Sequence, residues 1–180
     1  MNLKALNTFL SQANIKEHLS YYRTLKNKHS IIEKSYPDLK GKSAEEIFKM
    51  NLNRGLKEEL SRLLCKIKAH ELYFSSFSED VKPSFAVRKH YGSENSFIYE
   101  LKKAALSMEY GYAYVYLDFK GIPSFRCVCS LDERFIKDRP KLLVDLYEHA
   151  YFADYGFNYP LYLDGALSHI DLSRLESDKS

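Results

Sequence analysis

Residues 144–155 read VDLYEHAYFADY, a stretch that sets two polar side chains, Asp145 and His149, among aromatic and aliphatic ones. Four positions separate the pair, so both side chains lie on one face if the segment is helical. If a strand ends at Asp145 instead, the two side chains come close across a strand-to-helix turn. The pair is therefore either part of a metal site or two polar residues on an ordinary aromatic-rich segment.

The residues before this stretch predict an antiparallel sheet. KLLVDLY (141–147) has the composition of a strand that runs into Asp145. Two further strands, YAYVYLDF (112–119) and SFRCVCSL (124–131), flank a Lys-Gly turn and form a hairpin. Together the three segments predict a three-stranded antiparallel sheet.

Helices are predicted before and after these strands in the sequence. SENSFIYELKKAALSMEYG (93–111) has an amphipathic pattern that is closed by Gly111. YPLYLDGALSHIDLSRLE (159–176) is expected to be helical after Pro160. The second half of the chain is therefore expected to form an α/β lobe.

The first half of the chain is predicted to be a helical hairpin. IKEHLSYYRTLKNKHSIIEKSY (15–36) and LKEELSRLLCKIKAHELYFSSF (56–77) both carry apolar residues at helical spacing. Between them, Ser43 is followed three residues later by Glu46, the pattern of a capping box. Two long helices with a short connection pack antiparallel.

The fold class predicted from these segments is α+β. We expect an N-terminal antiparallel helical hairpin domain at residues 1–80 and a C-terminal α/β domain with the three-stranded sheet at residues 81–180. The boundary falls in SEDVKPSF (78–85), where the composition changes.

The composition narrows the class of protein. The chain has 180 residues, 45% of them hydrophobic and 28% charged, and no apolar run approaches the about 20 residues that span a bilayer. The N-terminus lacks the pattern of an export signal, so a soluble cytoplasmic protein without a membrane partner is expected. Three cysteines, an odd number without the spacing of a disulfide framework, fit a reducing compartment; they are Cys65, Cys127 and Cys129.

The charge pattern argues against a nucleic-acid partner. The formal net charge is +3, and the Lys and Arg residues are scattered along the sequence and do not form a basic run. Binding to nucleic acid is therefore not expected.

The histidines carry the chemistry when they are considered together. The chain has six of them, namely His18, His29, His70, His90, His149 and His169. In an antiparallel hairpin the start of one helix meets the end of the next, so His18 and His70 can converge with Asp145 and His149. Three imidazoles and a carboxylate suit a redox-capable ion such as iron or manganese, whereas structural zinc more typically recruits cysteines.

Several segments resemble the iron/manganese superoxide dismutases. VDLYEHAYFADY resembles the family signature Asp-Val-Trp-Glu-His-Ala-Tyr-Tyr, and AHELYF (69–74) resembles its Asn-His-x-x-Phe/Tyr-Trp segment. GKSAEEI (41–47) is similar to a common linker of the family, and counting back from it places the first ligand histidine at His18. YGSENSFIYELKKAALSMEYGYAYVYL (91–117) resembles the family's Gly-Ser helix and the strand that follows it.

The resemblance implies a fold, a metal and an activity. The ligands would be His18, His70, Asp145 and His149, with one iron or manganese ion per subunit. The activity would be that of an antioxidant enzyme, the disproportionation of superoxide to dioxygen and hydrogen peroxide. Glu148 would reach across the interface of a homodimer.

This chain departs from the family pattern around the ligands. Where the family has two histidines and a tyrosine after the first ligand, this chain has Tyr22, Arg23 and Lys26. Lys66 stands where the iron enzymes have a glutamine that binds the metal-bound solvent. Tyr22, Lys26 and Lys66 are therefore candidates for the groups that act beside the metal. Lys66 either points at that solvent and attracts superoxide, or extends outward as a solvated helix residue.

Further departures concern the walls of the pocket. Phe152 replaces a tyrosine three residues after the last ligand, and Cys129 or Ser130 occupies the region of the manganese-type glutamine. The expected tryptophans are replaced by Phe74, Tyr112 and Tyr147. The choice between iron and manganese therefore stays open.

Three hypotheses for function follow. The first is a superoxide dismutase with unusual residues around the ligands. The second is a diverged metal-binding protein of the same fold with another redox or sensing role. The third is an interaction subunit that kept the fold and lost the chemistry, but such a protein has no reason to retain all four ligands.

Overall fold

The computed structural model describes residues 3–176. In chain order the elements are α1 (Leu3–Leu6), α2 (Gln12–Ser35), a 3₁₀ helix (Pro37–Leu39), α3 (Ala44–Lys49), α4 (Arg54–Tyr73), α5 (Phe85–Tyr91), α6 (Glu94–Leu106), β1 (Tyr112–Leu117), β2 (Pro123–Val128), α7 (Glu133–Asp138), β3 (Leu142–Asp145), a second 3₁₀ helix (Glu148–Ala150), α8 (Phe152–Tyr155), α9 (Tyr159–Ser168) and a third 3₁₀ helix (Leu172–Leu175). The α+β class predicted from the sequence is confirmed.

None of the helices between residues 3 and 176 combines the length and the apolar character that a bilayer crossing needs.

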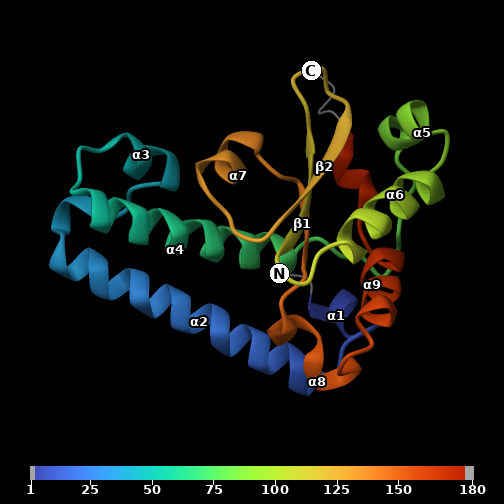
Figure 1. Ribbon diagram of the computed structural model, residues 1–180, viewed down its shortest axis with the longest axis horizontal. Coiled ribbons are helices and arrows are strands. Elements are labelled where there is room, and N and C mark those ends of the chain that lie inside the picture. The colour runs from blue at the N-terminus through green and yellow to red at the C-terminus, as the bar shows by residue number, and fades with distance from the viewer. Residues whose placement is uncertain (1–2, 177–180) are drawn as a thin grey trace.

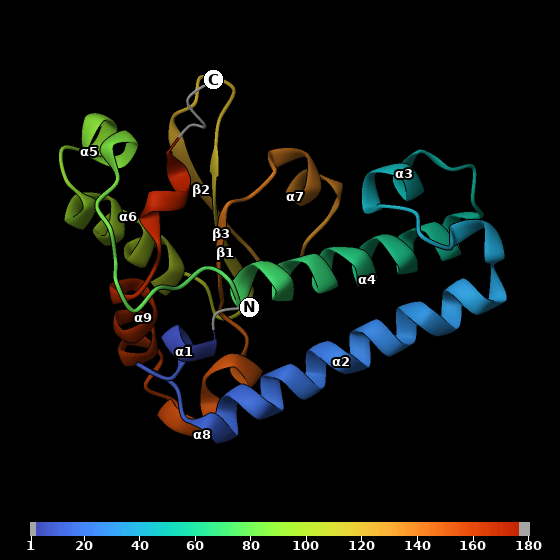
Figure 2. The same cartoon turned by 180° about the vertical axis from the view of Figure 1, so that it is seen from behind.

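Helices α2 and α4 lie side by side and antiparallel, as both views show (Figures 1 and 2). α2 begins three residues earlier than predicted because the Ser11 side chain accepts a hydrogen bond from the Asn14 N–H and caps the helix. The capping box of Ser43 and Glu46 forms as predicted and begins α3. α4 ends at Tyr73, so the prediction of a helix through residue 77 was too long.

The sheet has the strand order β2-β1-β3, and β1 pairs antiparallel with both neighbours. Tyr112 at the start of β1 lies opposite Val128 on one side and Asp145 on the other. The three-stranded antiparallel sheet predicted from the sequence is confirmed. β1 is largely buried because it lies at the centre of the sheet.

One hydrophobic cluster joins the helical hairpin to the sheet. It includes Ala69 and Tyr73 of α4, Val115 of β1, Val144 of β3 and Tyr162 of α9, all fully or almost fully buried. The cluster crosses the boundary expected at residue 80, and the division into two domains stays a prediction. Packing of this kind holds α2, α4 and the end of β3 in fixed relative positions.

The segment after β3 resolves the alternatives left by the sequence. The strand ends at Asp145 and a 3₁₀ helix starts at Glu148, so Asp145 and His149 face each other across a strand-to-helix turn. The Leu146 N–H donates to the Gly111 carbonyl at 2.9 Å and holds the turn against the start of β1. The helix expected over 159–176 is interrupted after Ser168, because Ile170 forms an antiparallel bridge with Phe77.

Candidate metal centre

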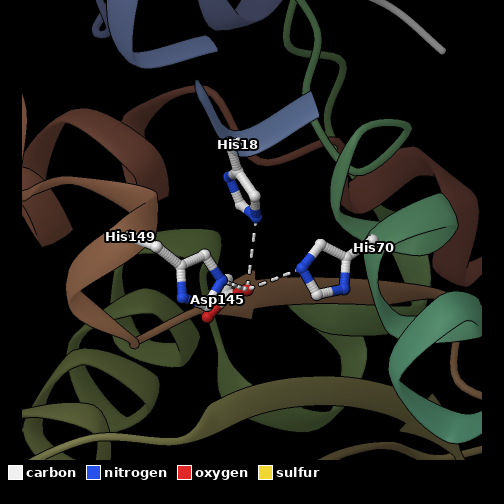
Figure 3. Close-up of side chains that lie close together, drawn as sticks. All are labelled: His18, His70, Asp145 and His149. Atoms are coloured by element: carbon white, nitrogen blue, oxygen red, sulfur yellow. Dashed lines mark hydrogen bonds and ion pairs between the residues drawn. The ribbon is translucent and has the colours of Figure 1, made fainter. Parts of the chain in front are cut away.

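Four side chains from separate elements converge at the junction of hairpin and sheet (Figure 3). His18 comes from α2, His70 from α4, Asp145 from the end of β3 and His149 from the following 3₁₀ helix. Asp145 Oδ2 lies 3.4 Å from His18 Nε2, 3.8 Å from His70 Nε2 and 3.2 Å from His149 Nε2. One ligand atom from each residue lies within 4.8 Å of all the others, and residues 3–176 hold no second group of this kind.

The group is closed on three sides and open on one. His18, His70 and Asp145 are at most 1% exposed, whereas the His149 side chain is 30% exposed. His149 is therefore the member of the group that solvent contacts. α2, α4 and the sheet exclude water from the other sides.

Hydrogen bonds behind the candidate ligands fix their orientation. The His70 Nδ1–H donates to the Lys66 carbonyl at 2.7 Å, which leaves the Nε2 lone pair facing Asp145. Asp145 Oδ1 accepts from the Tyr147 N–H at 3.0 Å, so its Oδ2 is the oxygen that faces the imidazoles. The buried Tyr162 hydroxyl donates to the Asp145 backbone carbonyl at 2.7 Å and anchors the end of the strand.

The charges and unsatisfied atoms of the group fit a cation. Burial lowers the pKa of His18 and lowers that of His70 to about 4, so both imidazoles are neutral and keep a free lone pair. Burial alone would raise the pKa of Asp145, but the neighbouring imidazoles of His149 and His18 hold it well below its usual value. Both ring nitrogens of His18 and the Nε2 of His70 are buried and have no hydrogen-bond partner within residues 3–176. A metal ion would satisfy Nε2 of both histidines and the carboxylate together.

The three residues predicted to act beside the metal lie at different depths. The Tyr22 ring is nearly parallel to that of His70, with 6.2 Å between centroids, but its hydroxyl donates to Glu71 Oε1 at 3.0 Å. Burial and the contact with Glu71 raise the pKa of Tyr22 to about 12. Lys26 is exposed, with Nζ 5.7 Å from the Tyr22 ring centroid, and Lys66 is half-buried with no ion pair from Nζ to any described residue.

The Tyr21 ring lies closer to the candidate ligand rings than the Tyr22 ring does. Its ring centroid is 4.6 Å from that of His149 and 5.4 Å from that of His70. Burial and the charge of Asp145 raise its pKa, so the phenol is protonated at neutral pH. The sequence alone does not distinguish Tyr21 from the other tyrosines of the chain, although its position three residues after His18 puts it on the same helix face.

The remaining wall of the group is aromatic. Phe74 packs on His18 at 5.0 Å between ring centroids, and Tyr147 stacks on His149 at 5.7 Å. Tyr112 packs edge-on against Tyr147 at 5.1 Å. The three residues that the sequence proposed as substitutes for tryptophan therefore do line or support this group.

A helical hairpin packed on a three-stranded antiparallel sheet, with three histidines and an aspartate at their junction, is an arrangement suited to a metal-binding class of protein. Residues 80–178 match the family model described as iron/manganese superoxide dismutases, C-terminal domain. The chain is 32% identical over 155 residues to proteins named superoxide dismutase (Fe) from Aquifex aeolicus and Aquifex pyrophilus, covering 76% of this chain and 71% of each relative. The chain belongs to the iron/manganese superoxide dismutase family.

Proposed function

We propose that the protein is a superoxide dismutase with one iron or manganese ion per subunit, held by His18, His70, Asp145 and His149. The observation that carries the proposal is the convergence of these four donors within 4.8 Å in a chain of this family. A bound ion would take one electron from one superoxide and return it to a second, which acquires two protons and leaves as hydrogen peroxide.

The residues of the chain would bind the metal ion, orient superoxide beside it and supply protons. Asp145 supplies the one negative charge among the four donors, so a divalent or trivalent ion keeps a net positive charge that favours an anionic substrate. The exposed edge of His149 is the side from which superoxide would enter. Tyr21 lies at that edge and would donate a hydrogen bond to the second superoxide. Lys66 and Lys26 would add positive charge near the entrance.

The test combines metal analysis with a dismutase assay on the purified protein. We expect about one iron or manganese ion per subunit, activity that disappears with the metal after chelation, and recovery when one of the two ions is restored. Metal-loaded protein with no more activity than the free ion would overturn the proposal.

The second candidate is a metalloprotein of the same fold with another redox or sensing role. It is favoured by the Tyr22 hydroxyl, which is bound to Glu71 on the neighbouring helix, and by Lys66 in place of a glutamine. A protein with full metal content and reversible one-electron chemistry, but slow dismutation, would support this candidate. Dismutation at nearly diffusion-limited rates would exclude it.

Substitution of Tyr21 and Tyr22 separates a role in catalysis from one in stability. Tyr21→Phe is expected to lower turnover about tenfold, because a positioned proton donor is lost. Tyr22→Phe is expected to lower the free energy of unfolding by about 1 kcal/mol, through the lost bond to Glu71, with turnover within about twofold of the parent. Turnover by pulse radiolysis and urea unfolding measure the two effects, and equal turnover of both variants would contradict this assignment.

We also propose a homodimer built around Glu148, in the cytoplasm as the composition suggests. Glu148 is exposed and directly precedes the ligand His149, and the exposed Phe152 and Phe157 pack together nearby, with 5.3 Å between ring centroids. An exposed carboxylate beside apolar rings suits an interface that approaches the metal centre.

Glu148→Ala is expected to weaken the dimer at least about tenfold, because a buried interfacial carboxylate that pairs with the partner would be lost. Sedimentation velocity over a range of concentrations measures the dissociation constant. Glu79→Ala removes an exposed carboxylate elsewhere and serves as the control. A parent protein that stays monomeric at high concentration would contradict the proposal.

A further inference from the structure

We propose that a second site, separate from the metal centre, binds a nucleoside polyphosphate. The site is a cleft of about 1260 Å³ lined by α3, α7, the β1–β2 hairpin and the loop that enters β3. Figure 1 shows α7 standing between α3 and the hairpin, above α4. None of the four metal-ligand candidates lines the cleft. Sites for small ligands usually enclose about 300–1,000 Å³, so the cleft has room for a nucleotide with its phosphates.

The cleft accounts for the net charge of the whole chain. Seven of the 27 Lys and Arg residues line it, together with four of the 24 Asp and Glu residues. The other 20 basic and 20 acidic residues cancel, so the formal net charge of +3 lies in this one concave region. The fold therefore brings seven basic residues from distant parts of the sequence to one cleft. A concave cationic surface focuses the electrostatic field and attracts anions.

Four of the lining cations are unpaired. Lys49 of α3, Lys68 of α4, and Arg139 and Lys141 of the loop before β3 form no side-chain hydrogen bond or ion pair with the part of the chain that the structure describes. By contrast, the Lys137 amine is bound by Glu133 at 3.1 Å. Cations from three separate elements that face one cleft without a partner are suited to several phosphate oxygens.

A fixed carboxylate holds two arginines in the wall. Asp138 accepts hydrogen bonds from Arg126 Nε at 2.9 Å, Arg134 Nε at 3.0 Å and the Tyr114 hydroxyl at 2.9 Å. The Asp138 side chain is only 9% exposed, so this network ties α7 to β1 and β2. Each arginine uses Nε for Asp138, and its terminal nitrogens have no hydrogen-bond partner in the described part of the chain. Such a wall is organised before binding, which lowers the entropic cost of binding.

The backbone at Arg139 supplies an independent argument. With φ at +48°, Arg139 is the one residue other than glycine between residues 3 and 176 that has a positive φ. It lies at the C-terminal cap of α7, a position that favours glycine because a side chain is strained there. Strain of this kind tends to persist where the side chain has a use. In this cleft that use is to supply one of the four unpaired cations.

The aromatic residue at the mouth of the cleft indicates the ligand class. Phe119, in the turn of the β1–β2 hairpin, is 93% exposed and lines the cleft. An exposed ring beside phosphate-binding cations can stack on a nucleobase. The residues outside the cleft lining carry equal numbers of basic and acidic side chains, which favours a small nucleotide over a nucleic-acid strand.

Calorimetric titration of the metal-loaded protein with ATP tests the proposal. Equimolar Mg²⁺ keeps the nucleotide from extracting the bound metal, and salt at about 0.15 M screens weak surface binding. We expect saturable binding with a Kd below about 100 μM and at least about fivefold weaker binding of tripolyphosphate. Phe119→Ala should remove the preference for ATP, because the stacked base loses its platform.

Charge variants locate the site. Lys49→Gln with Lys141→Gln is expected to weaken ATP binding at least about tenfold. The control pair, Lys89→Gln with Lys103→Gln, changes the net charge equally on exposed parts of α5 and α6 outside the cleft and should bind as the parent does.

Arg139→Gly gives two effects of opposite sign. The melting temperature should rise because glycine relieves the strain, while ATP affinity should fall at least about threefold. A binding loss with a higher melting temperature cannot come from damage to the fold. The proposal is overturned by absence of saturable binding up to about 1 mM ATP, by equal loss in the control pair, by equal binding of tripolyphosphate, or by tighter binding of a single-stranded oligonucleotide.

Discussion

Replacing His149 by alanine is expected to lower metal affinity at least about a hundredfold and to abolish dismutase activity above that of the free ion. Removal of a group that merely supports a ligand typically costs about 10–100-fold in affinity, and loss of a donor atom costs more. His149 Nε2 is also the imidazole nitrogen nearest to Asp145 Oδ2, at 3.2 Å. Without it, the remaining three donors leave the exposed side of the site open to water.

His90→Ala is the matched control for this experiment. His90 is exposed on α5 and lies outside the four-residue group, so its loss should leave metal content and turnover unchanged. Metal analysis after dialysis against a weak chelator and a superoxide assay on the same sample measure both effects. Circular dichroism shows whether the variant is folded. A folded His149→Ala protein that retains its full metal would refute the ligand assignment.

The long helices and the sheet could be predicted because their patterns extend over many residues. Apolar spacing located α2 and α4, and two strand-like segments that flank a Lys-Gly turn located β1 and β2. The ends were less certain, because they depend on single side chains: Ser11 extended α2 by capping it. The six-residue helix α7 gave no periodic signal, since so short a helix is stabilised mainly by tertiary packing.

The convergence of the four candidate ligands was expected from the sequence, and the structure brings all four together. The orientation of hydroxyl groups could not be predicted, because it depends on contacts between helices. Tyr22 and Tyr21 are adjacent in α2, yet the Tyr22 hydroxyl reaches Glu71 on α4 while the Tyr21 ring packs on His149. Likewise, the cations of the cleft come from segments between residues 49 and 141 that only the tertiary fold brings together.

Gly111→Ala is expected to lower the free energy of unfolding by about 3–5 kcal/mol, which combines the costs of overpacking and of a strained backbone. At this position φ is +135°, and an added Cβ would lie 2.1 Å from the Val128 carbonyl oxygen. That oxygen belongs to the end of β2, so relief of the clash requires β1 and β2 to separate. The Gly111 carbonyl also accepts the Leu146 N–H at 2.9 Å, directly after Asp145.

The same displacement should reach the metal centre, because Tyr112 is paired with Asp145 across β1 and β3. Gly121→Ala is a control that introduces backbone strain without a steric clash. At Gly121 φ is +73°, but an added Cβ meets no atom within 4 Å. This control should therefore cost only about 1–2 kcal/mol and leave metal affinity unchanged. Urea unfolding of the metal-free and metal-loaded forms measures both quantities. If Gly111→Ala and Gly121→Ala lost the same stability, backbone strain alone would explain them, and the contact with Val128 would have no special part in positioning Asp145.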